Sequence, residues 1–144
     1  MTDLHLPLVF LLVAGSIIAA VLIGGCLGGG PEPGDPNIRV VSPAEASALI
    51  EERGDDPSFV VIDARRPDEF AGGHIPGAIN IDSADFSEHL DSLDPDGTYV
   101  VYCLRGGRSA GVCELMREAG FREVYDIEGG MSAWKAAGLP VAVD

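Results

Sequence analysis

Short apolar runs alternate with helix-like stretches from residue 38 to the end of the chain, and no other feature constrains the fold as strongly. Five of these runs have the length of short strands. They are IRVV (38–41), FVVID (59–63), AINI (78–81), TYVVY (98–102) and EVYDI (123–127). The run FVVID has no polar alternation, which is typical of a strand covered on both faces. The alternation predicts an α/β domain over residues 38–144, with about five short, mostly parallel strands and helices on both faces.

The stretches between the runs carry helix signals. In SPAEASALIEERG, Ser42 is placed as the N-cap, Pro43 at the first helical position, Glu45 at the third and Gly54 as the terminator. Further helical segments are predicted at PDEFAGG (67–73), ADFSEHLDSL (84–93), SAGVCELMREAG (109–120) and MSAWKAAG (131–138). The chain has 144 residues, which accommodates one domain of ordinary size and not a second.

The first part of the chain differs in composition from the rest. Residues 6–25 contain no charged side chain and have the length, about 20 residues, that a helix needs to cross a bilayer. We therefore predict a signal peptide or transmembrane anchor over residues 1–25, followed by a Gly/Pro-rich linker over residues 26–37. The segment LIGGC resembles the lipobox of prokaryotic lipoproteins. That resemblance implies cleavage before Cys26, lipidation of its sulfur and a membrane-anchored domain on the extracytoplasmic face.

An uncleaved anchor is the alternative for this leader. A secretory signal normally begins with Lys or Arg, whereas the opening residues here offer only Asp3 and His5. The first basic residue after the apolar segment is Arg39, which would favour a domain facing the cytoplasm.

Charge and histidine spacing exclude two classes of partner. The formal net charge of −14 argues against nucleic-acid binding, which requires a basic patch. His5, His74 and His89 lie far apart and have no ligand-type spacing with the cysteines, so neither a metal nor another cofactor is expected.

The segment CLRGGRS (103–109) concentrates the candidate chemistry. It places Cys103 at the carboxyl end of a strand and before a helix, where α/β folds bind ligands. The two glycines allow backbone N–H groups to turn inward, and the two arginines add positive charge. Together they should lower the pKa of the Cys103 thiol and bind an anion. We therefore predict Cys103 as the nucleophile and, as substrate-binding residues, Leu104, Arg105, Gly106, Gly107, Arg108 and Ser109.

The residues alone leave the anion open, because phosphate, arsenate and sulfur oxyanions are all tetrahedral acceptors of hydrogen bonds. The other side chains near this motif are predicted to be structural. Cys113 would lie about 9 Å along the helix that follows the loop, which is unfavourable for a disulfide with Cys103, so both thiols should be free. Cys113, Met131 and Trp134 are predicted to be core residues.

Residues 38–144 resemble the rhodanese-like, single-domain sulfurtransferases. The motif C-x4-R, Cys103 to Arg108, has the loop length seen in that family. Cysteine phosphatases, including those that share the fold, have C-x5-R and usually a histidine before the cysteine, where this chain has Tyr102. Two further segments are similar to the same family: VIDARRPDEFAGGHIPGAINI (61–81) and EGGMSAWKAAGLPV (128–141). The resemblance implies a rhodanese-like fold.

The resemblance also implies a two-step sulfur transfer that needs no cofactor. The Cys103 thiolate would take the outer sulfur of a thiosulfate-like donor and pass it from a persulfide to a thiol or cyanide acceptor. Two alternatives stay open: a phosphatase or arsenate reductase on the same fold, and a membrane-located module that presents sulfur or a bound anion without turnover.

Within the segment 61–81, most residues are predicted to shape the scaffold. Arg65 and Glu69 stand four apart and can pair. Asp63 and Arg65 are the candidates for lining the substrate pocket. His74 is expected to hydrogen-bond a neighbouring loop rather than to act as a base, because a stabilised thiolate needs none.

Overall fold

The computed structural model describes residues 37–143 and contains one five-stranded sheet. The strands are β1 (Asn37–Val41), β2 (Phe59–Asp63), β3 (Ile79–Asn80), β4 (Thr98–Tyr102) and β5 (Glu123–Ile127). Their order across the sheet is β1-β5-β4-β2-β3, and every neighbouring pair is parallel. The predicted leader, Cys26 and the linker up to residue 36 lie outside the described residues. Within residues 37–143, no helix combines the length and the hydropathy needed to cross a membrane.

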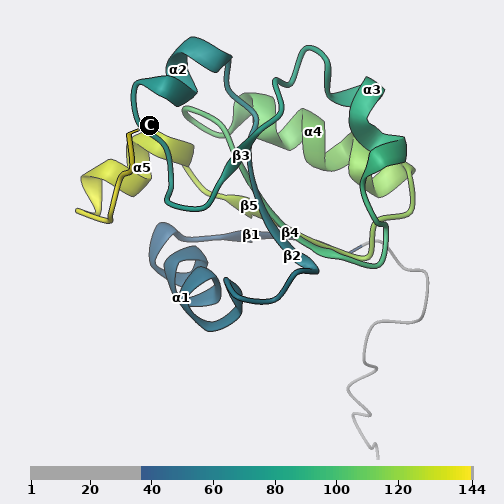
Figure 1. Cartoon of the computed structure of the whole chain (residues 1–144), viewed down its shortest axis with the longest axis horizontal. Coiled ribbons are helices and arrows are strands. Elements are labelled where there is room, and N and C mark those ends of the chain that lie inside the picture. Colours follow the sequence, from purple (N-terminus) through teal and green to yellow (C-terminus); the bar gives the residue numbers. More distant parts are fainter. Residues whose placement is uncertain (1–36, 144) are drawn as a thin grey trace, which may run out of the picture.

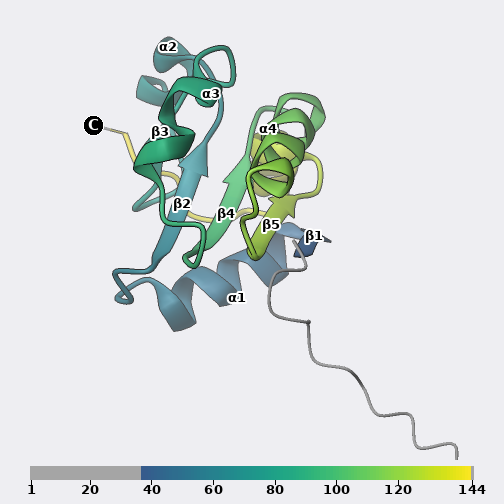
Figure 2. The ribbon, with the colours of Figure 1, turned by 90° about the vertical axis from the view of Figure 1, so that its right-hand side faces the viewer.

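Five α-helices lie between or after the strands in the described part of the chain. They are α1 (Pro43–Arg53), α2 (Pro67–Ala71), α3 (Phe86–His89), α4 (Gly107–Glu118) and α5 (Gly130–Ala136). Helices α1 and α5 cover one face of the sheet, whereas α3 and α4 cover the other (Figures 1 and 2). The predicted α/β architecture, with a parallel sheet between helical layers, is confirmed.

Burial on both faces explains the continuous apolar run of β4. Val101 packs against the α4 side of the sheet, together with Val112 and Met116. Its neighbours Val100 and Tyr102 pack on the opposite side, where Trp134 of α5 is also buried. Successive strand residues point to opposite faces, so a strand covered twice must be apolar at every position.

The start of α1 follows the predicted capping pattern. The Ser42 hydroxyl accepts a hydrogen bond from the Glu45 backbone N–H at 3.3 Å, and the Ser42 N–H donates to the Glu45 carboxylate at 2.8 Å. This reciprocal arrangement is a capping box, which satisfies two N–H groups that would otherwise lack partners.

Several element boundaries differ from the sequence prediction. Strand β3 has two residues rather than four, because the turn that closes with the Ala78 N–H donating to Ile75 O occupies its predicted start. The predicted helix over 84–93 is a short α-helix that tightens into a 3-10 helix at Leu90–Ser92. Helix α4 begins at Gly107, two residues before the segment SAGVCELMREAG (109–120).

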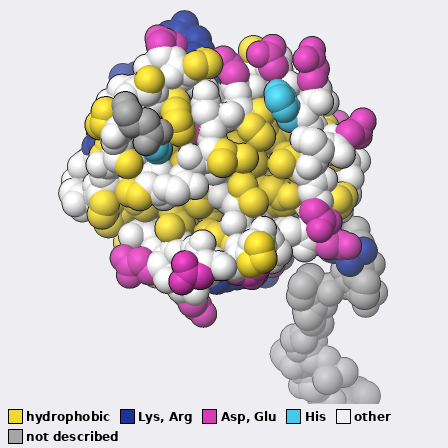
Figure 3. Space-filling model, viewed as in Figure 1, with side chains coloured by type: hydrophobic (Ala, Val, Ile, Leu, Met, Phe, Trp, Pro, Cys, Tyr) yellow, Lys and Arg dark blue, Asp and Glu magenta, His cyan; other side chains and the backbone are white. Residues whose placement is uncertain are grey.

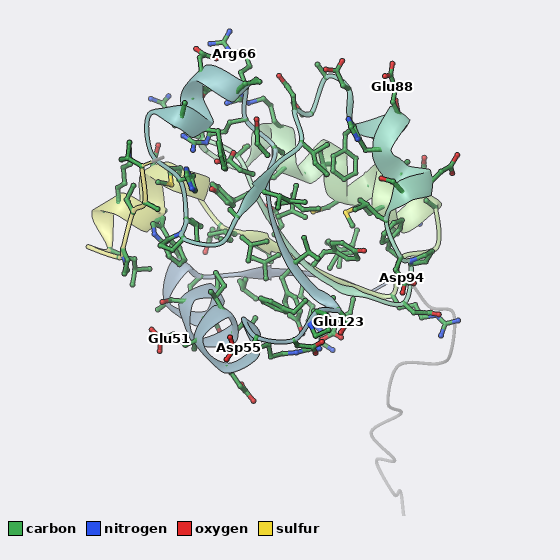
Figure 4. All side chains as sticks on the ribbon, in the orientation of Figure 1. Glu51, Asp55, Arg66, Glu88, Asp94 and Glu123 are labelled. Carbon is green, nitrogen blue, oxygen red and sulfur yellow. The ribbon has the colours of Figure 1, made fainter. Side chains whose placement is uncertain are left out.

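Acidic side chains dominate the rim of the molecule. They surround a more apolar centre on the face shown in Figure 3. Glu51, Asp55 and Glu88 all project away from the ribbon (Figure 4). Acidic charge is therefore prominent on the exposed surface, whereas the candidate chemistry lies at the carboxyl end of β4.

Candidate active site

Cys103 lies directly after β4, and its side chain is 1% exposed. The chain turns sharply behind it, because Gly106 has a left-handed backbone with a φ of 100°. This conformation is readily adopted by glycine. It brings the Gly106 N–H to 3.1 Å from the Cys103 sulfur, which accepts the hydrogen bond. The predicted close turn around a strand-end sulfur is present.

Hydrogen bonds set the ionisation of Cys103. Burial raises the pKa of its thiol, but several donors together outweigh burial and bring the pKa below its ordinary value of 9.0. These donors are the backbone N–H and hydroxyl of Ser109 and the backbone N–H groups of Arg105 and Gly106. The pKa of Cys103 is therefore shifted in the predicted direction. The groups that lower it are backbone amides and one hydroxyl rather than the guanidinium groups.

Arg108 is bound to a carboxylate from another element. Its guanidinium group donates to both oxygens of Glu69 on α2, at 2.8 Å and 3.0 Å. The hydrogen bonds from Arg108 lower the pKa of Glu69 to about 2. Such bidentate pairs fix the orientation of both side chains. Arg108 thus ties the cysteine loop to α2, and much of its charge is compensated there.

The predicted pair between Arg65 and Glu69 is wrong. Arg65 lies before α2 begins and is not on the same helix as Glu69, so the spacing of four has no helical meaning. Arg65 instead donates to Asp63, with Nη2–Oδ2 at 2.6 Å and Nε–Oδ1 at 2.9 Å, and to Gly73 O at 2.8 Å. Asp63 is 0% and Arg65 3% exposed. This buried ion pair, together with the bond to Gly73 O, fixes the conformation of the segment that follows β2.

An open pocket lies beside the cysteine loop. Its lining residues are Arg66, Glu69, Asp82, Ser83, Ala84, Leu104 and Arg108. Leu104, which is 37% exposed, forms part of the apolar lining. Asp63 and Arg65 are not among the lining residues. Two arginines and two carboxylates meet in this pocket, so its charge is mixed rather than uniformly positive.

The start of α5 holds the backbone of the cysteine loop. The Met131 N–H donates to Cys103 O at 2.8 Å, and the Ser132 N–H donates to Leu104 O at 3.0 Å. Gly130 has a φ of 55°, and a Cβ there would lie 2.9 Å from the carbonyl carbon of Leu104. Only glycine permits this approach. Sequence reasoning missed this role, although the Gly-Gly pair after β5 was a signal of it.

Two of the remaining predicted residues, His74 and Cys113, are packed within the fold. His74 Nδ1 lies 3.1 Å from Phe70 O, and the two rings stack with centroids 3.9 Å apart, consistent with the predicted scaffold role. Cys113 is buried on α4, and both it and Cys103 are free thiols, as expected. Arg105 is exposed at the loop. Among residues 37–143, no group of three or more His, Cys, Asp or Glu side chains is arranged to hold a metal ion.

Comparison with known proteins gives one matching family model. The model of the Rhodanese-like domain matches residues 42–137. The Bacillus subtilis protein YtwF, which carries a provisional sulfurtransferase name, is 40% identical over 94 residues, or 65% of this chain and 90% of that protein. The thiosulfate sulfurtransferase GlpE of Coxiella burnetii is 33% identical over 98 residues, or 68% of this chain and 88% of that protein.

Solved structures agree with the sequence matches. The crystal structure of a rhodanese-related protein from Thermoplasma volcanium superposes with a TM-score of 0.65 at 31% identity. The match covers 74% of this chain and 99% of that chain. The Alr3790 protein from Anabaena gives a TM-score of 0.64 at 28% identity, covering 72% of this chain and 82% of that chain.

Proposed function

Because this chain belongs to the rhodanese-like domain family, we propose that it is a thiosulfate-type sulfurtransferase that carries sulfur as a persulfide on Cys103. The observation that carries the proposal is the buried Cys103 sulfur facing the N–H groups of residues 105, 106 and 109, which lower its pKa. The matched relatives named as sulfurtransferases support the same reaction class.

The mechanism follows from the donors around the sulfur. In the first step the Cys103 thiolate attacks the outer sulfur of thiosulfate, a new S–S bond forms, and sulfite leaves with the electron pair of the broken S–S bond. In the second step an acceptor thiolate or cyanide attacks the outer sulfur of the persulfide, and the Cys103 thiolate is released. The N–H groups that stabilise the thiolate also stabilise the anionic persulfide, so the same ring of donors serves both steps.

The loop length favours this reaction over phosphoryl or arsenate chemistry. Four residues separate Cys103 from Arg108, one fewer than in the cysteine phosphatases. A smaller ring suits a single sulfur atom rather than a phosphoryl group.

Sulfur transfer from thiosulfate to cyanide tests the function. We expect the wild-type protein to gain about 32 Da, one sulfur atom, after exposure to thiosulfate. Cys103→Ser should lose both the mass gain and the activity. Cys113→Ser is the matched control and should keep both, because Cys113 is buried within α4. Equal turnover by wild type and Cys103→Ser would refute the proposal, and hydrolysis of an aryl phosphate without a persulfide would favour a phosphatase.

We further propose that the domain is tethered to the membrane through Cys26 and faces the extracytoplasmic side. The support is the uncharged segment 6–25 followed by LIGGC. The intact mass of the native protein tests this. Cleavage before Cys26 removes the mass of residues 1–25, and lipidation adds the mass of the lipid to Cys26. A full-length, unmodified mass would favour the uncleaved anchor.

A further inference from the structure

The open pocket beside the cysteine loop lies at the same level of the sheet as the reactive sulfur. Asn80 of β3 is in register with Asp63 of β2, which is in register with Tyr102 of β4. Asp82 and Leu104 each come two residues after that level, and both line the pocket. Neighbouring strands lie about 4.8 Å apart, so the chains that lead to Asp82 and Leu104 leave the sheet about 10 Å from each other. A pocket of this width suits a small molecule.

One part of the pocket lining carries two guanidinium groups around one carboxylate. Arg108 donates to both oxygens of Glu69, and Arg66 Nε lies 3.5 Å from Glu69 Oε2. Two positive charges and one negative charge leave a formal excess of one positive charge in this part of the lining.

Arg66 supplies that excess in an accessible form. Its side chain is 66% exposed and projects from the start of α2 (Figure 4). Within residues 37–143, its guanidinium group makes ion pairs with Asp68 and Glu69 at 3.6 Å and 3.5 Å but no hydrogen bond. Asp68 does not line the pocket. The donors of Arg66 are therefore available to a ligand.

A different segment of the lining carries a negative charge. Asp82 follows β3, and its Oδ1 atom accepts the Ala84 N–H at 3.0 Å. That bond holds the carboxylate in the turn. In the part of the chain that the structure describes, no basic side chain forms an ion pair with Asp82. Between the two charged segments, the apolar side chain of Leu104 lies next to the reactive cysteine and is 37% exposed.

This distribution of charge favours a ligand that has both a carboxylate and an ammonium group. A guanidinium group binds a carboxylate, and a carboxylate binds an ammonium group. A ligand with negative charge alone is repelled by Asp82 and by the net charge of −14, and a ligand with positive charge alone is repelled by Arg66. A zwitterion can pair with both side chains, while its methylene group contacts Leu104.

We propose that this pocket binds the acceptor of the second step and that the acceptor is a small zwitterionic thiol, with its carboxylate on Arg66 and its ammonium group on Asp82. Both are specificity-determining residues, and their role in turnover rests on the proposed sulfur transfer. The acceptor thiolate attacks the outer sulfur of the Cys103 persulfide and forms a new S–S bond. The bond from that sulfur to Cys103 Sγ breaks, and its electron pair leaves with Sγ as the thiolate.

Removal of sulfur from the Cys103 persulfide by four thiols tests the assignment. L-cysteine carries both charged groups, 3-mercaptopropionate lacks the ammonium group, cysteamine lacks the carboxylate, and ethanethiol lacks both. The protein is loaded with thiosulfate and freed of the donor. The rate at which the peptide that contains Cys103 loses about 32 Da, one sulfur atom, is then measured with each thiol. Each thiol is compared with itself across protein variants, so its intrinsic reactivity cancels.

The two variants should affect different thiols. Arg66→Gln should slow the reactions of cysteine and 3-mercaptopropionate about three- to fivefold, the effect of one exposed ion pair. Asp82→Asn keeps the oxygen that accepts the Ala84 N–H and should slow cysteine and cysteamine to a similar extent. Ethanethiol should respond to neither variant. Arg122→Gln and Asp91→Asn, at exposed positions outside the pocket, are the matched controls and should leave all four rates unchanged. If either pocket variant left the cysteine rate unchanged, the proposal would be overturned.

Disulfide exchange tests the pocket without thiosulfate. The unmodified Cys103 thiolate attacks L-cystine, cystamine or 3,3′-dithiodipropionate, a mixed disulfide forms, and one thiolate leaves. The attached group then occupies the position of the acceptor, so the rates of mass gain on the Cys103 peptide should depend on Arg66 and Asp82 in the same pattern. That pattern without a persulfide would refute only the proposed function. A persulfide whose removal by cysteine ignores both variants would refute only the assignment of the pocket.

Discussion

At the scale of single residues, the chemistry depends on which donors face the Cys103 sulfur. The sequence predicted that inward-turned backbone N–H groups and the two arginines of CLRGGRS would together lower the pKa of the thiol. In the structure, N–H groups and the Ser109 hydroxyl do so, whereas Arg108 is held by Glu69. A backbone amide costs little entropy to position, since the turn at Gly106 already fixes it. Arg108 is therefore better placed to fix the loop than to ionise the sulfur.

The pair between Glu69 and Arg108 predicts an acid-dependent contribution to stability. The folded-state pKa of Glu69, about 2, lies below its ordinary value of 4.5. The stability that ionised Glu69 contributes through this pair is thus complete above pH 4.5 and is lost as the pH falls toward 2. Because both side chains are partly exposed, we expect Glu69→Gln to cost about 1 kcal/mol or less at pH 7. The difference from the wild type in urea unfolding should shrink steadily below pH 4.5.

Glu114→Gln is the control for this prediction, since Glu114 pairs with Arg117 on the exposed surface of α4. It should give a smaller difference at pH 7 than Glu69→Gln. A Glu69 effect that stays constant between pH 5 and pH 3 would contradict the assignment.

At the scale of secondary structure, local signals located the elements but not their partners. The capping pattern at Ser42 and the continuous run FVVID predicted α1 and β2 correctly. Such signals act within a few residues, so they are readable in one sequence. The pairing of Glu69 with Arg108 and the docking of α5 onto the cysteine loop are set by tertiary contacts. For the same reason, the spacing of Arg65 and Glu69 was misleading.

The contact between α5 and the loop after β4 predicts a strong effect at Gly130. Gly130→Ala must accommodate a Cβ against the carbonyl groups of Cys103 and Leu104, in addition to a positive φ. We expect a loss of about 2–4 kcal/mol in the free energy of unfolding and slower alkylation of Cys103, because its carbonyl is displaced from the Met131 N–H.

Gly138→Ala separates the two causes of that loss, the positive φ and the contact of the added Cβ with the cysteine loop. Gly138 also has a positive φ, 70°, but nothing lies within 4 Å of the position of its Cβ. It should cost only about 1 kcal/mol and leave the alkylation rate unchanged. Equal losses for the two variants would show that backbone strain alone, and not the contact between α5 and the cysteine loop, determines the effect.

At the scale of the whole molecule, the site and the net charge have opposite effects on an approaching anion. Parallel strands bring Cys103, the start of α4 and the start of α5 to one edge of the sheet, where N–H groups of the cysteine loop and of the start of α4 face the sulfur. The chain as a whole has a formal charge of −14, and acidic side chains project from its rim (Figures 3 and 4). An approaching dianion therefore meets repulsion at long range and hydrogen-bond donors at short range.

This opposition predicts that added salt should speed reactions of anions with Cys103. Raising the ionic strength from about 0.01 M to 0.15 M shortens the Debye length from about 30 Å to 8 Å, which screens the distant carboxylates more than donors in contact with the sulfur. The measurement is the ratio of alkylation rates by anionic iodoacetate and neutral iodoacetamide, in which the thiolate fraction cancels. We expect the ratio to rise about two- to threefold. A ratio that falls would mean that Arg105 and Arg108 dominate the field that anions meet.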